Sequence, residues 1–267
     1  GTIADIVSVT GENRYIVEQG LMILRNTERC GLIELMKLAG IIDDNGDCKK
    51  ITSDSIAFMI APRINASGRF GSPSQAFELL MCDDPDAAAG MADSLNDLNN
   101  QRKAAENEII EQIFSQINND PAMLSERVLL FYGENWHHGV IGIVAAKLLE
   151  KYGKPCIIIT KEGDVSRGSA RAFGDFSVFE CLTACEEVLL KYGGHMGAGG
   201  FSLKTSDIEK FHSLLRDYSL KSHESMPVYT IRAEKLLRAS EITVKNVEGL
   251  NLLEPFGEGN EKPFFAL

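Results

Sequence analysis

A long helical pattern runs through the middle of the chain, from Pro85 to Ile117. Apolar residues recur there every three or four residues or at the sum of these intervals, as on one face of an α-helix. They are Met91, Leu95, Leu98, Ala105, Ile109, Ile113 and Ile117. Asp84 supplies an N-cap before a proline at the first helical position. Such a helix would extend about 50 Å, so we predict that it links two domains.

The sequence after this helix alternates between strand and helix patterns, which predicts an α/β domain. The expected strands are Val128–Tyr132, Pro155–Thr160 (with the apolar run of a parallel sheet), Ser166–Phe173 and Ala198–Leu203. The expected helices are Gly139–Tyr152, Ser177–Tyr192 (ended by Gly193) and Ser206–Lys221 (opened by a Ser206–Glu209 capping box). A further strand, Val228–Ala233, is expected to begin another domain.

The section before the long helix has mostly helical periodicity. The expected helices are Tyr15–Arg25, Leu32–Ala39, Ser53–Ile60 and Ser74–Leu80, after a strand at Thr2–Val9. The section opens without a lead-in, and we expect it to be the end of a domain rather than a whole one.

Composition excludes several classes of protein. No apolar run approaches the ~20 residues of a membrane-spanning helix, and no signal segment opens the chain, so we expect a cytoplasmic protein with no membrane partner. Six cysteines without a CxxC pair indicate reduced thiols rather than a zinc or disulfide framework. The net charge of −11 excludes a histone-like binder but not a nuclease, because an enzyme needs only a local basic patch.

Glycine is most concentrated between Tyr192 and Phe201, where five glycines occur among eight residues. Backbone without Cβ atoms can approach a ligand closely and offer its N–H groups to a phosphate. His195 adds a donor that titrates near neutral pH. We predict a phosphate-binding loop that includes Gly193 and Gly194; the alternative is a helix C-cap and tight turn around a buried histidine.

Two other segments of the α/β section carry groups suited to anions. Ser169 and Arg171 are two residues apart on an expected strand and would face the same way, so they could hold a terminal phosphate; the alternative is a polar edge strand. Trp136–Ala145 leads from a strand into a helix whose first amides could bind an anion. His137 and His138 there do not predict zinc, because adjacent side chains diverge and no other ligand stands at suitable spacing.

Two segments near the N-terminus are weaker candidates. Arg63, Asn65 and Arg69 are expected in a donor-rich loop, which is either functional or a solvated basic turn. Asp5 is a carboxylate expected at the end of a strand, where it can hold a divalent ion or simply cap a helix.

These segments resemble the RecJ exonucleases of the DHH phosphoesterase superfamily. The matching motifs are Gly1–Asp5 with Gly11–Arg14, Arg63–Arg69, Trp136–Ala145, Gly168–Arg171, Gly193–His195, and Pro255–Asn260 with Pro263. The resemblance implies an α/β protein with the end of a DHH domain at 1–83, a connecting helix at 84–120, a DHHA1 domain at 121–225 and the start of an OB-fold β domain at 226–267.

The resemblance also implies a function: single-strand-specific 5′-to-3′ DNA exonuclease activity in repair and recombination. Ser169 and Arg171 would hold the 5′-phosphate. His195, as a catalytic-site residue, would contact the strand near the scissile bond together with Gly193, Gly194 and His137. Arg63, Asn65 and Arg69 would bind phosphates. Asp5 would be a catalytic ligand of Mn²⁺ or Mg²⁺, whose bound water attacks phosphorus.

The Asp-His-His motif of this family is expected before Gly1. Asp5 cannot hold two metal ions alone, so we expect this chain to bind DNA weakly without cleaving it, and the full-length parent to be an active monomer. Single-stranded DNA is the expected partner, with a single-strand-binding protein or helicase as further partners.

Two other functions remain open at this point. One is a related phosphodiesterase of short oligonucleotides or cyclic dinucleotides, against which Arg63–Arg69 and Pro255–Asn260 argue. The other is a non-catalytic nucleic-acid-binding module like that of alanyl-tRNA synthetase.

Overall fold

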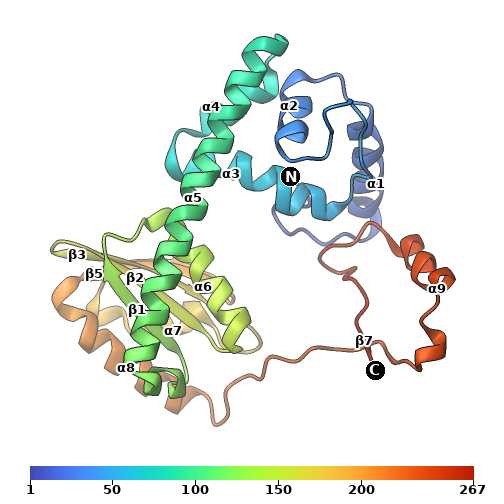
Figure 1. The fold of residues 1–267 in the computed structure, drawn as a ribbon. Helices are drawn as coiled ribbons and strands as arrows, with labels where there is room; N and C mark the ends of the chain where they lie inside the picture. Colours follow the sequence, from blue (N-terminus) through green and yellow to red (C-terminus); the bar gives the residue numbers. More distant parts are fainter. The chain divides into compact units, whose positions relative to one another are not determined.

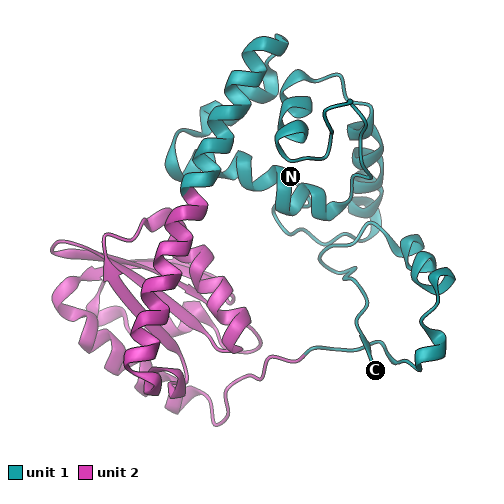
Figure 2. Ribbon diagram, viewed as in Figure 1, with its two compact units in different colours: residues 1–101, 231–267 teal, residues 102–230 magenta.

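The computed structural model describes residues 1–267 and confirms a mixed α/β protein. The chain divides into two compact units, of which unit 1 comprises residues 1–101 and 231–267 and unit 2 comprises residues 102–230 (Figure 2). The predicted long helix exists as α5 (Pro85–Asn119), and the division between the units falls within it. Asp84 accepts a hydrogen bond from the amide of Asp86, as expected for its N-cap.

Unit 2 is built on one five-stranded sheet (Figure 1). Its strands, in spatial order, are β1 (Leu129–Glu134), β2 (Cys156–Glu162), β3 (Val165–Arg171), β5 (Ala198–Lys204) and β4 (Leu189–Gly194). The β1–β2 pair is parallel, as the apolar run in β2 predicts, and the other pairs are antiparallel.

One face of this sheet is covered by α7 (Val178–Ala184) and α8 (Ile208–Ser222). Alternate residues of four strands turn to this face and form one core with both helices, among them Leu130, Ile157, Ala170 and Phe201. Because side chains alternate along a strand, Ser169 and Arg171 must point to the other face.

The other face is covered in part by α6 (His138–Tyr152), which packs on β2 and β3. The second half of α5 is tied to this part of unit 2. The indole of Trp136 donates to Gln112 Oε1 at 2.8 Å, and the Gln116 amide donates to the carbonyl of Tyr132 at 2.9 Å. β5 and β4 lie beyond α6 on this face.

Unit 1 is mainly helical. It contains α1 (Gly11–Arg25), α2 (Cys30–Leu38), the π-helical turn η1 (Ser55–Ile60), α3 (Ala61–Phe70), α4 (Pro73–Met81) and the first half of α5. Leu35, Leu79 and Leu95 are fully buried in its core. No helix of either unit is both long and apolar enough to span a membrane.

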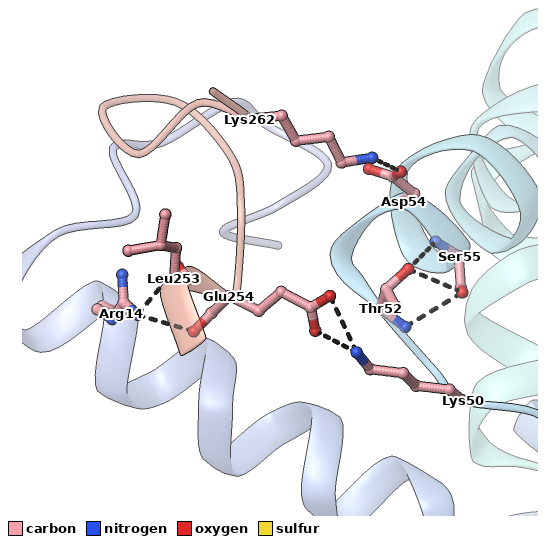
Figure 3. Close-up of polar contacts among 8 residues, drawn as sticks. All are labelled: Arg14, Lys50, Thr52, Asp54, Ser55, Leu253, Glu254 and Lys262. Atoms are coloured by element: carbon pink, nitrogen blue, oxygen red, sulfur yellow. Dashed lines mark hydrogen bonds and ion pairs between the residues drawn. The ribbon is translucent and has the colours of Figure 1, made fainter. Parts of the chain in front are cut away.

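The last segment of the chain returns to unit 1 (Figure 3). Arg14 donates to the carbonyls of Leu253 and Glu254, at 3.1 and 2.7 Å. Glu254 pairs with Lys50 at 2.7 Å, and Lys262 pairs with Asp54. The segment itself forms β6 (Lys235–Leu236), α9 (Val244–Gly249) and β7 (Phe265–Ala266), with short 3₁₀ turns at Ala239–Glu241 and Leu250–Leu253.

Two predictions for unit 1 are wrong. Thr2–Val9 is not a strand: the Asp5 amide bonds the carbonyl of Gly1, and Ile6 has a φ of 55°. Arg63–Arg69 is not a loop but most of α3, where Ala66 and Ser67 are buried and Pro62 stands in the first turn. The motif's glycine, serine and asparagine have low helix propensity, and packing in the core overrides it.

Three predictions for the later part of the chain are also wrong. The helix expected at Ser177–Tyr192 ends at Ala184, because the following residues pair with β5 as strand β4. The Ser206–Glu209 capping box does not form, since Ser206 lies in a 3₁₀ turn and α8 begins at Ile208. Val228–Ala233 is not a strand: its backbone pairs with no neighbouring strand, and its apolar side chains are exposed.

Candidate nucleic-acid interface

Ser169 and Arg171 lie side by side on β3, as predicted. Arg171 Nη1 donates to Ser169 Oγ at 3.0 Å and to the carbonyl of Ala170 at 2.8 Å. Both side chains are partly buried, and β3 is the central strand of the sheet, so the alternative of a polar edge strand is wrong. A hydroxyl and a guanidinium are thus held together at a defined place on the α6-side face.

Helix α6 comes very close to this pair at Gly142. A Cβ atom on Gly142 would lie 2.8 Å from Arg171 Nη2 and 2.9 Å from Ser169 Oγ, nearer than real Cβ contacts. The missing side chain therefore lets the serine and arginine pack directly on the helix. Gly142 was not predicted as a site residue, although a glycine inside a helical pattern is itself a signal of close approach.

His137 is the N-cap of α6. Its Nδ1 accepts a hydrogen bond from the amide of Gly139 at 3.1 Å, so the neutral ring carries its proton on Nε2. Burial lowers the pKa of His137, and the neighbouring His138, stacked at 5.1 Å, lowers it further. His137 is therefore a neutral donor at the start of α6, where the helix dipole favours anions.

The predicted glycine loop is a β-hairpin. Gly193 pairs with Gly200, which in turn pairs with Ser169, so these three residues share the α6-side face. A Cβ on Gly193 would meet nothing within 4 Å, and one on Gly200 would meet only a carbonyl oxygen at 3.8 Å. Beside the Ser169–Arg171 pair the sheet is thus bare backbone that a ligand can reach.

His195 lies in the turn of this hairpin, next to Gly194, the last residue of β4. It is exposed, so the alternative of a buried histidine is wrong. His195 Nδ1 accepts a hydrogen bond from the amide of Gly197 at 3.2 Å, which leaves Nε2 as the proton donor of the neutral ring. The carbonyl of Gly197 bonds the amide of Ala172, so the turn is attached to the end of β3.

The remaining predicted site residues belong to unit 1. Arg63 is bound within its own unit: Nη2 donates to the carbonyl of Leu38 at 3.0 Å, Nη1 to that of Met59 at 2.5 Å, and Nε to Asn96 Oδ1 at 3.0 Å. Burial lowers its pKa. These contacts give Arg63 a clear structural role in unit 1, as a link between α2, η1 and α5.

Asn65, Arg69 and Asp5 are exposed. Asp5 does not form a metal site by itself, since no group of three or more His, Cys, Asp or Glu side chains in residues 1–267 could hold an ion. Residues 1–267 alone therefore supply no complete set of three such ligands around Asp5.

Comparison with known proteins agrees with the motifs. The DHHA1 domain family matches residues 122–220, which lie within unit 2. A Bacillus subtilis (strain 168) protein described as single-stranded-DNA-specific exonuclease RecJ is 34% identical over 98% of the chain and 33% of its own length. The Thermus thermophilus protein of the same description is 31% identical over 100% of the chain and 37% of its own length. The chain thus spans about a third of the length of these relatives.

Solved structures give the same result. The crystal structure of RecJ from Thermus thermophilus in complex with Mn²⁺ matches with a TM-score of 0.86 and 31% identity, covering 99% of this chain and 38% of that one. The Mg²⁺ complex matches with a TM-score of 0.84 and 29% identity, covering 99% and 40%. Along its whole length, the chain is homologous to part of the RecJ proteins, and its residues 122–220 form a DHHA1 domain.

Proposed function

We propose that this chain is the part of a single-strand-specific 5′-to-3′ DNA exonuclease of repair and recombination that binds the strand and its 5′-phosphate. The observation that carries the proposal is the α6-side face of unit 2, where Ser169 and Arg171 adjoin the bare backbone of Gly193 and Gly200. The described RecJ relatives act on single-stranded DNA.

Each group on this face has a definite task toward a phosphate. Arg171 supplies a permanent charge in a planar fork that matches two phosphate oxygens, and Ser169 supplies a hydroxyl donor. His137 and His195 place Nε2–H donors at the helix start and at the hairpin turn. The glycines let the sugar–phosphate chain lie on the sheet, because side chains there would hold it away.

The chemistry of bond cleavage is proposed to need divalent ions held with ligands beyond those of this chain. Manganese or magnesium would activate water and neutralise charge at phosphorus. We propose that Asp5 contributes one ligand and that Asn65 and Arg69 contact phosphates nearby. We infer that residues 1–267 alone bind the strand and do not cleave it, because they provide no set of three donor side chains.

The test is equilibrium binding of this chain to one oligonucleotide prepared with a 5′-phosphate and with a 5′-hydroxyl. We expect a preference for the phosphate form, lost in Arg171→Ala and kept in the control Arg216→Ala. Arg216→Ala removes the same charge from α8, which covers the opposite face of the sheet. Equal affinity of the parent chain for both ends would overturn the proposed end-binding site.

A further inference from the structure

The three strands beyond the sheet's parallel pair have a charge unlike the rest of the chain. β3, β5 and β4 contain four basic residues and no acidic one, in a chain whose net charge is −11. The four are Arg167, Arg171, Lys191 and Lys204. Of these four residues, only Arg171 belongs to the proposed end-binding site.

All four basic side chains project from the α6-side face. Arg167 pairs with Ser202, and Ser202 pairs with Lys191, so these three residues form one row across the sheet. Arg167 has the same parity on β3 as Ser169 and Arg171, and Lys204 has the same parity on β5 as Ser202. The opposite parity, including Ala170, Phe201 and Tyr192, packs into the core with α7 and α8.

Resting on the proposed function, we infer that the row Arg167, Ser202 and Lys191 is a second phosphate-binding subsite for the single-stranded DNA backbone. It repeats the chemistry of the first: cationic side chains with a serine hydroxyl. Arg167 and Lys191 are exposed, and Arg167 pairs with Glu162 at 3.3 Å.

The spacing of the two subsites suits one strand. Two residues along a β-strand cover about 6.8 Å, so the row lies that far from the row of Ser169, Gly200 and Gly193. Between the two rows, the single-stranded DNA would cross β-sheet backbone that carries only small side chains. A positively charged surface that follows the sugar–phosphate backbone is a usual part of sites that bind single strands without reading their sequence.

The experiment measures the salt dependence of oligonucleotide affinity for the whole chain and its variants. For single strands, each phosphate neutralised contributes about 0.7 to the slope of log K against log salt. We expect Arg167→Ala and Lys191→Ala each to lower the slope by about that amount, while the ratio of 5′-phosphate to 5′-hydroxyl affinity stays unchanged.

Two controls separate this effect from folding and from net charge. Lys191→Arg keeps the charge and should keep the slope. Lys210→Ala removes one charge from α8, where Lys210 pairs with Glu187 at 3.0 Å, and should leave the slope unchanged. Circular dichroism of each variant confirms the fold.

An unchanged slope in both Arg167→Ala and Lys191→Ala would overturn the second subsite, and the end-binding site would stand if Arg171→Ala still lost the phosphate preference. A lowered slope in a chain that shows no phosphate preference would support the subsite and overturn the end-binding site. The two proposals therefore fail separately.

Discussion

Gly142→Ala is expected to weaken phosphate binding while leaving the protein as stable as before or more so. The new methyl group would lie 2.8 Å from Arg171 Nη2 and 2.9 Å from Ser169 Oγ. Ordinary van der Waals contact requires about 3.5–4.0 Å, so the arginine and serine must both move by several tenths of an ångström or more. Neither group is removed; only their placement changes.

The two expected effects have opposite signs. Alanine is favoured over glycine in a helix interior by about 1 kcal/mol, which offsets the cost of moving the flexible end of Arg171 and rotating the Ser169 hydroxyl. A displaced guanidinium loses a charge-assisted hydrogen bond to phosphate, of about 1.5–3 kcal/mol. At 1.4 kcal/mol per tenfold change, the 5′-phosphate preference should fall by roughly ten- to a hundredfold.

The assay compares 5′-phosphate and 5′-hydroxyl oligonucleotide affinities with thermal unfolding of the same samples. Gly90→Ala in α5 is the matched control, because its added Cβ would meet nothing within 4 Å. It should gain stability and keep the preference. An undiminished preference in folded Gly142→Ala would refute the argument that this glycine positions the pair.

Three other predictions concern stability. His137→Asn keeps an N-cap acceptor, and we expect this variant to lose less stability on acidification than the parent chain. The folded pKa of His137 is lowered, so its contribution to stability is present above about pH 6.5 and is lost as pH falls through the folded pKa. Urea unfolding between pH 5 and 8 measures the difference. Arg63→Ala should cost about 2–4 kcal/mol in urea unfolding, because it leaves the partly buried carbonyls of Leu38 and Met59 without its donors; a loss below 0.5 kcal/mol would contradict this. Arg14→Ala should speed proteolysis of residues 231–267, because Arg14 donates hydrogen bonds to the carbonyls of Leu253 and Glu254 in this segment. An unchanged cleavage rate would contradict that role.

The fold was most predictable where periodicity was long or strands were flanked by clear turns. Helix α5 and the β1–α6–β2 unit follow their patterns closely. Prediction failed where tertiary packing decided the outcome. Residues 189–192 have an apolar pattern that a helix could also use, but Tyr192 packs on the core only as part of a strand beside β5.

The candidate site was predictable as a set of chemical groups rather than as an arrangement. Ser169 and Arg171 could be paired from strand alternation alone. The role of Gly142 could not, because it depends on how α6 crosses β3, which no local pattern records. The glycine-rich segment was singled out from its composition, but its conformation was not predicted: its open positions, Gly193 and Gly200, lie opposite each other in a hairpin.

Two arginines illustrate why a motif cannot assign a role by itself. Both Arg63 and Arg171 stand in motifs that resemble those of the RecJ exonucleases, and both were expected to bind phosphate. Arg63 directs three nitrogens to acceptors on α2, η1 and α5, so its contacts stabilise unit 1. Arg171 donates to the Ser169 hydroxyl and to the carbonyl of Ala170, on a face where the neighbouring strands offer bare backbone. The difference lies in the surroundings: the glycine backbone beside Arg171 is open to a ligand, which makes Arg171 the better candidate for contact with DNA.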